Sequence, residues 1–230
     1  MPLSGKQVRV ETRREQILFA AADCFRQFGF HSASISRISA AAGMSPGHIY
    51  YYFTSKEAII AAIVCRDLAG QIELMEMLRR EGRSSSLVRD RIASAMRAQL
   101  NPEIAALKVE ILAEAGRNLE IGKVVRDADS VIRHSLALAV EEVRRSAGFD
   151  DDPEGIAALV EVLLTIYNGL SLRVIRNPSL DPGPLIERAG VLIHDALMGS
   201  VQAPDSAGGA GNDGRELDDQ VKVLLKGQSN

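Results

Sequence analysis

The sequence predicts an all-α protein, and three of its features lead to that fold class. Apolar residues recur three and four positions apart through most of the 230 residues, which is the spacing of one face of a helix. Short segments that begin with Ser, Thr, Asn or Asp separate these runs, and such residues cap helices. No stretch alternates apolar and polar residues as a half-buried strand would. With 46% hydrophobic and 25% charged residues, a chain of this length can bury a core without disulfides or metals.

The first helix is predicted over residues 12–28, after a flexible arm over residues 1–11. Thr12 to Glu15 forms a capping box, in which each side chain pairs with the backbone amide of the other residue. Gly29 then supplies a left-handed stop. The apolar residues that give this helix its period are Ile17, Leu18, Ala21, Ala22, Phe25 and Phe28.

Two short helices follow, joined by a tight turn. The first starts at Ser34 and ends at Gly43, whose backbone freedom permits the turn. The second starts at Ser45, a capping residue that precedes Pro46 at the first helical position. Two short helices in this arrangement predict a helix-turn-helix, whose second helix lies in the major groove of DNA. We therefore expect a DNA-binding domain over residues 12–57.

The rest of the chain predicts longer helices with short breaks, which form a larger domain over residues 58–199. A helix that is apolar almost all round, from Ile156 to Ile175, must be covered on most of its surface. Central packing and a subunit interface both satisfy that requirement. Residues 200–230 are small and polar, and we expect disorder there. The expected helices cover residues 55–80, 88–100, 102–115, 119–145, 154–176 and 184–198.

Charge and cysteine usage bear on the partner and the compartment. Residues 1–60 hold seven basic and four acidic side chains, a formal charge of +3, so the remaining residues carry −6 of the total of −3. A basic end on an acidic body favours an anionic partner for the first segment, although ordinary surface fluctuation also gives a difference of this size. Two cysteines without a pattern, no signal peptide and no apolar run of about 18 residues indicate a cytoplasmic protein.

The second helix of the pair carries side chains that suit DNA. Gly47 lets the backbone approach closely, while histidine and tyrosine side chains supply donors for phosphate and flat rings for thymine methyl groups. The alternative is that Tyr50, Tyr51 and Tyr52 are core or interface aromatics. Because successive helical residues point about 100° apart, at least one of the three must be exposed. The candidate DNA-binding residues are Ser34, Ser36, Arg37, Ser45, Gly47, His48, Tyr50, Tyr51, Tyr52 and Lys56.

These residues belong to a longer pattern. Residues 35–58, ISRISAAAGMSPGHIYYYFTSKEA, resemble the signature of the TetR (tetracycline-repressor-like) family, and residues 20–35, AAADCFRQFGFHSASI, are similar to its first helix and the entry to its second. The resemblance implies that Tyr50, Tyr52 and Lys56 bind phosphates, that Gly47, His48 and Tyr51 face the bases or vary, and that Ser34, Ser36 and Arg37 contact DNA from the preceding helix. Tyr52 stands where many members have histidine, and His48 where many have a small residue.

The resemblance also implies that the larger domain binds a ligand and dimerises. We expect a repressor that a small-molecule effector releases from a palindromic double-stranded DNA operator. Two copies would pair through residues 154–176 and 184–198, as a homodimer. The candidate ligand-binding residues are Met96, His134, Tyr167 and Asn168.

Two other functions remain open. An effector-independent architectural or cell-division DNA-binding protein of the same fold would carry the same N-terminal pattern. A small helical enzyme would need a polar catalytic cluster, and the sequence offers no candidate triad or metal-ligand set. The dinucleotide-like string at residues 209–214 follows no predicted strand, so it carries no cofactor prediction. We therefore expect no enzymatic activity, no cofactor and no metal.

Overall fold

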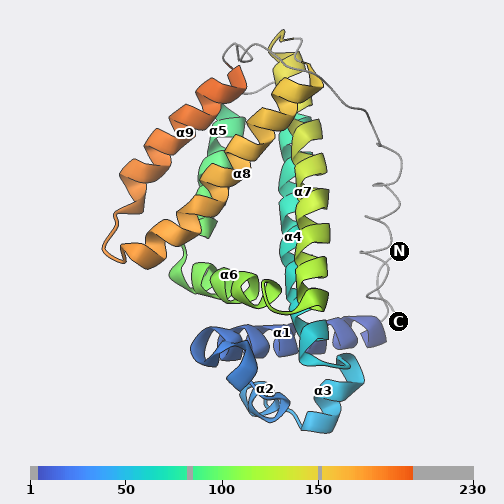
Figure 1. The fold of residues 1–230 in the computed structure, drawn as a ribbon. Helices are drawn as coiled ribbons and strands as arrows, with labels where there is room; N and C mark the ends of the chain where they lie inside the picture. The colour runs from blue at the N-terminus through green and yellow to red at the C-terminus, as the bar shows by residue number, and fades with distance from the viewer. Residues whose placement is uncertain (1–4, 82–84, 150–151, 199–230) are drawn as a thin grey trace. The chain divides into compact units, whose positions relative to one another are not determined.

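The computed structural model describes residues 5–81, 85–149 and 152–198, and within these ranges the chain is helical without strands. The predicted all-α class is confirmed. Figure 1 shows how the helices are arranged. They are α1 (Gly5–Ser32), α2 (Ile35–Ala41), α3 (Pro46–Tyr52), α4 (Lys56–Glu81), α5 (Ser85–Gln99), α6 (Pro102–Ala115), α7 (Leu119–Ser146), α8 (Pro153–Arg176) and α9 (Pro182–Met198).

The described residues fall into two compact units. Unit 1 combines residues 1–66 with 106–126, and unit 2 combines residues 67–105 with 127–230. Each division lies inside a helix, so α4, α6 and α7 each contribute to both units. The sequence predicts one boundary after residue 57, whereas unit 1 also holds the end of α6 and the start of α7.

Unit 1 has its own core, drawn from all of its helices. Phe25 of α1, Ile38 of α2 and Ile49 of α3 are fully buried, and Ile121 of α7 is 1% exposed in the same cluster. Burying a side chain of this size stabilises the fold by about 1.5–3 kcal/mol. These contacts hold the two short helices against α1 and fix which of their residues remain on the surface.

The boundaries of α1 differ from the prediction. The helix begins at Gly5, so the expectation that Thr12 starts it is wrong. No proline interrupts residues 5–11, and the helix simply continues through them. Gly29 does break the helical path, with φ 73° and ψ 162°, but a last turn follows to Ser32. The remainder of the expected flexible arm, residues 1–4, lies outside the described residues.

The later helices begin where their caps predict. Asn101 Oδ1 accepts a hydrogen bond from Glu103 N at 2.8 Å, and Asp152 Oδ1 accepts one from Gly155 N at 2.6 Å. These bonds satisfy backbone amides that have no partner within the helix. The last described helix starts at Pro182 rather than Pro184. The tail predicted to be disordered, 200–230, lies outside the described residues.

In unit 2, α5 runs alongside α8 and α9 (Figure 1). Leu68 of α4 packs with Val131 and Ile132 of α7. An 18-residue window of α8 has a mean hydropathy of 1.6, yet only 33% of that window is buried. By length and composition alone such a helix would suit a membrane, a property that core helices of soluble proteins share. Most of its large apolar side chains are buried or half-buried, and the exposed ones are Val162, Leu172 and Ile175.

Candidate functional site

The two short helices each begin at a serine whose side chain accepts a local hydrogen bond, as the sequence predicts. Ser34 Oγ accepts from Arg37 N and caps α2, and Ser45 Oγ accepts from His48 N and caps α3, both at 3.2 Å. Gly43 sits between them with φ 63°, a left-handed conformation that favours glycine. The predicted helix-turn-helix is therefore present.

Two side chains of α1 donate hydrogen bonds to backbone carbonyls at the ends of α2 and α3. Gln16 Nε2 donates to Ala42 O at 2.7 Å, and Arg14 Nη1 donates to Tyr52 O at 3.4 Å while its guanidinium lies 4.7 Å from the centre of the Phe53 ring. Sequence reasoning missed both contacts, because helix periodicity shows which face is polar but not what it touches across the fold.

The outer face of α3 is aromatic and exposed. Tyr50 is 55% and Tyr51 75% exposed, so the interpretation that all three tyrosines are buried is excluded. Tyr52 is half-buried, with its ring 5.0 Å from that of Tyr51 and 5.4 Å from that of His48. Gly47 and His48 are exposed beside them, and no atom lies within 4 Å of the position a Cβ on Gly47 would take. The open backbone and the rings form one continuous surface.

The cations near this face have different surroundings. Arg37 is exposed, and its guanidinium stacks 4.1 Å from the centre of the Phe28 ring. Lys56 is half-buried, and its Nζ donates to Phe30 O at 2.7 Å and lies 4.4 Å from the centre of that ring. Ser34, together with Ser36 and Ser45, is exposed. Lys56 thus already has a hydrogen-bond partner inside unit 1, the carbonyl oxygen of Phe30.

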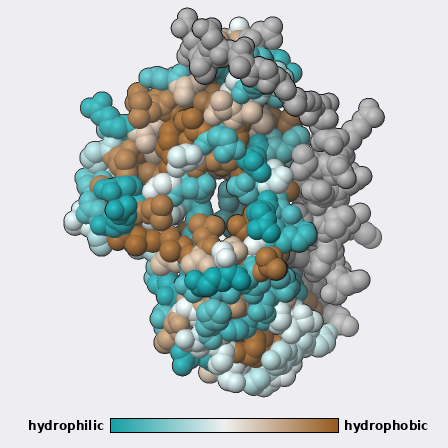
Figure 2. Space-filling model, in the orientation of Figure 1, coloured by the Kyte–Doolittle hydropathy of each residue, from teal (hydrophilic) through white to brown (hydrophobic). Residues whose placement is uncertain are grey.

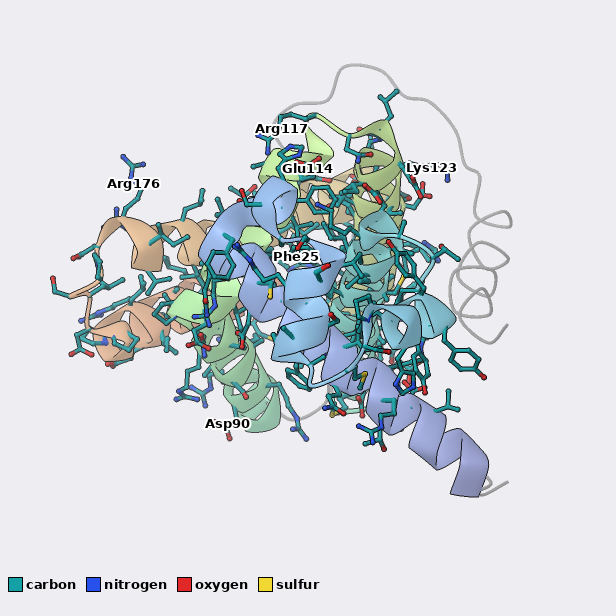
Figure 3. All side chains as sticks on the ribbon, turned by 90° about the horizontal axis from the view of Figure 1, so that it is seen from below. Phe25, Asp90, Glu114, Arg117, Lys123 and Arg176 are labelled. Atoms are coloured by element: carbon teal, nitrogen blue, oxygen red, sulfur yellow. The ribbon has the colours of Figure 1, made fainter. Side chains whose placement is uncertain are left out.

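The end of α1 is also tied to α6. Glu110 Oε1 accepts from Phe30 N at 2.7 Å. Glu114, whose side chain is 3% exposed, contacts His31 Nε2 at 3.3 Å and Arg117 at 3.1 Å, and Figure 3 shows Arg117 beside it. Glu114 thus forms its ion pair with Arg117 although its own side chain is almost fully buried.

A cavity of about 100 Å³ lies inside unit 2. Aliphatic and methionine side chains of α4, α5, α7, α8 and α9 line it, together with Gln71 and Tyr167. Two predicted ligand-binding residues, Met96 and Tyr167, are among them, whereas His134 and Asn168 are not. Asn168 is exposed rather than buried.

The polar end of the cavity wall is a short buried network. Gln99 Nε2 donates to the Tyr167 hydroxyl oxygen, and Ser171 Oγ donates to Gln99 Oε1, both at 2.8 Å. Burial raises the pKa of Tyr167 to about 12, and the hydrogen bond from Gln99 offsets a part of that rise. The phenol is therefore neutral at physiological pH. Within the described residues, no group of three or more His, Cys, Asp or Glu side chains is placed to hold a metal ion.

Comparison with known proteins gives the same picture for the sequence and the fold. Residues 17–63 match the model of the tetR family of bacterial regulatory proteins. The transcriptional regulator UidR of Escherichia coli K12, of the helix-turn-helix type, is 29% identical over 153 residues, which is 65% of this chain and 76% of UidR.

Two solved structures share the fold. A TetR transcription regulator from Haloarcula marismortui is 20% identical with a TM-score of 0.66, and the match covers 84% of this chain and 100% of that one. FadR from Bacillus subtilis, solved in complex with stearoyl-CoA, is 18% identical with a TM-score of 0.64, and the match covers 82% and 99%. At these identities the structures support the fold alone.

Proposed function

We propose that this chain, which belongs to the TetR family of bacterial regulatory proteins, is a homodimeric repressor that a small-molecule effector releases from a palindromic DNA operator. The observation that carries the proposal is the exposed surface of α2 and α3, where Tyr50, Tyr51 and Arg37 surround an open helix start. Such a regulator acts in the cytoplasm, where its DNA lies, and performs no enzymatic step.

The roles of the DNA-binding residues follow from their surroundings. Tyr50 and Tyr52 lie in the second half of α3 and carry hydroxyl groups that can bond phosphate oxygens. Gly47, His48 and Tyr51 would face the bases of a major groove. Lys56 is a phosphate ligand in this proposal, and an ammonium with three N–H donors can serve a phosphate as well as the Phe30 carbonyl.

The uncovered apolar surface of α8 and α9 supports the homodimer. Figure 2 shows hydrophobic residues gathered over the part of unit 2 where these helices lie. An apolar patch of this kind marks an interaction site, and pairing of two copies would set two recognition helices about 34 Å apart, one turn of DNA. The exposed apolar residues of these helices are Val162, Leu172, Ile175, Val191 and Leu192.

The cavity of unit 2 supports effector control. FadR of Bacillus subtilis was solved with stearoyl-CoA, which makes ligand binding by a protein of this fold a reasonable basis for the proposal. Affinity alone would not release DNA. The effector must bind the conformation that fits the operator less well more tightly than the one that fits it.

The test is to select binding sites from genomic fragments with the purified full chain and to measure affinity for them at several salt concentrations. We expect a palindromic site, and Arg37→Ala and Tyr50→Phe should each weaken binding, the former by about tenfold with a salt slope reduced by about one. Lys123→Ala is the control, because Lys123 is exposed on α7 of the same unit. It should change neither the affinity for the site nor the salt slope. If Arg37→Ala and Tyr50→Phe bind the selected site as the unsubstituted chain does, the assignment of this surface is wrong.

A further inference from the structure

The wall of the unit 2 cavity selects the charge of its occupant. Among the described residues that line it, Gln71 and Tyr167 are the polar ones and neither is ionised at neutral pH. The acid next to them, Asp67, is exposed, accepts from Gln71 Nε2 at 2.7 Å and does not line the cavity. A carboxylate placed inside would lose its hydration beside this like charge, and an ammonium would lose its hydration without a carboxylate in the wall, which is strongly unfavourable. The wall therefore rejects ionic head groups.

Tyr167 is where a fixed polar network reaches this wall. Behind it, Gln99 and Ser171 are 3% and 2% exposed, and their hydrogen bonds set the direction of the Gln99 amide. Buried polar groups are held by such partners, so the hydroxyl oxygen has a defined position. A hydroxyl group is both donor and acceptor, which suits an alcohol or a carbonyl compound.

The volume limits the size of the occupant. An apolar cavity of about 150 Å³ on the same scale accommodates a single benzene ring, and this cavity measures about 100 Å³. The occupant is therefore smaller than a benzene ring, and a chain of about four carbons suits such a space. A long acyl chain would require the helices to move apart.

We propose that the cavity binds a small, uncharged, mainly aliphatic molecule that carries one hydroxyl or carbonyl group, held at Tyr167. The inference rests on the proposed function in one respect, since it names the chemical class of the effector of that regulator. It distinguishes this chain from a sensor of long-chain acids or of charged metabolites.

The first experiment compares three probes that share one alkyl chain. Calorimetric titration of the full chain at neutral pH with 1-butanol, butyrate and butylammonium should give an affinity for 1-butanol at least tenfold above those for the two ions. Equal or tighter binding of either ion, or no binding of 1-butanol, would overturn the proposal.

A pair of matched variants locates the site. Ala95 lines the cavity, whereas Ala98 of the same helix is exposed. We expect Ala95→Leu to lower the affinity for 1-butanol at least tenfold and Ala98→Leu to leave it unchanged. Because a larger side chain can disturb folding, we also make the opposite change. Leu136→Ala enlarges the cavity and should raise the affinity for 1-hexanol relative to 1-butanol. If both Ala95→Leu and Leu136→Ala behave as Ala98→Leu does, the binding site lies elsewhere and the proposal fails.

Operator binding in the same samples separates this inference from the proposed function. Intact operator binding without any affinity for 1-butanol would refute the ligand class alone. Binding of 1-butanol without release of the operator would support the ligand class and refute effector control. Failure of the unliganded chain to select any DNA site would refute the proposed function. The calorimetric result would then still test which ligands the cavity binds.

Discussion

Arg144 is the most informative position for testing how unit 2 is held together. Its side chain is 1% exposed on α7, and its Nη1 donates to Ala196 O at 3.0 Å and to Leu197 O at 3.1 Å. It therefore satisfies carbonyls at the end of α9, where a cation also interacts favourably with the helix dipole. We expect Arg144→Met, which keeps an unbranched apolar stem, to destabilise the protein and loosen α9.

The magnitude follows from the contacts that are lost. A hydrogen bond to a charged group contributes about 1.5–3 kcal/mol, and two bonds that share one nitrogen contribute less than twice that amount. Removing a buried charge also relieves a desolvation cost, which offsets part of the loss. The expected decrease in the free energy of unfolding is therefore about 2 kcal/mol.

The assay is urea unfolding at a fixed protein concentration, with hydrogen exchange of residues 182–198 as the local measurement. Arg145→Met is the matched control, because Arg145 is the next residue, 69% exposed, and pairs at 2.7 Å with Glu142. An exposed pair contributes about 0–1 kcal/mol. A difference of less than about 0.5 kcal/mol between the two variants in the free energy of unfolding would show that hydrogen bonds from Arg144 do not stabilise this helix end. Hydrogen exchange in α9 that does not accelerate in Arg144→Met would show the same.

Three further predictions concern other parts of the fold. Gly29→Ala should cost about 1–2 kcal/mol of stability, because φ is 73° and a Cβ would lie 3.2 Å from a carboxylate oxygen. Gly70→Ala, in an open position within α4, should stabilise by about 0.5–1 kcal/mol, and thermal unfolding of both variants checks the signs. Folding raises the pKa of Tyr167 to about 12 from an ordinary 10, so the folded state favours the neutral phenol. The contribution of this group to the free energy of unfolding is therefore fully present below pH 10 and is lost as the pH rises towards 12. Urea unfolding at pH 8 and pH 11 should show about 1.4 kcal/mol more loss for the unsubstituted chain than for Tyr167→Phe, and equal losses would contradict the burial of the phenol. Leu192→Glu should convert the dimer to a monomer in sedimentation, whereas Leu119→Glu, at a position 88% exposed in unit 1, should not.

Local signals made the helices and their starts predictable. Ser34, Ser45, Asn101 and Asp152 each act through an amide two or three residues away, so the information lies in the segment itself. The failure at Thr12 has the same origin: a capping pattern can open a helix, but it does not exclude a helix that began earlier, as α1 does at Gly5. The exposed tyrosines were predictable too, because the period of a helix forces neighbouring residues onto different faces.

The residues that line the cavity were harder to predict, for a physical reason. A helix that is apolar almost all round gives no period from which to infer its inward face, so α8 offered no basis for separating Tyr167, which lines the cavity, from Asn168, which is exposed. The burial of Gln99 could not be predicted for another reason. It is a polar residue whose partners lie 68 and 72 positions away, and only packing of α5 against α8 shows that it is buried.

The backbone of Phe30, at the end of α1, makes contacts that bear on where the DNA-binding unit ends in the sequence. Phe30 N donates to Glu110, 80 residues away, and Phe30 O accepts from Lys56. Both backbone groups at the end of α1 are thus held by charged side chains from helices that continue into unit 2. Ile121 of α7 belongs to the core of unit 1 as well. Residues 1–66 alone would keep the contact with Lys56 but would lose the one with Glu110 and part of their own core. The helix-turn-helix is therefore continuous in sequence, but the physical unit that holds it in shape is completed by residues 106–126.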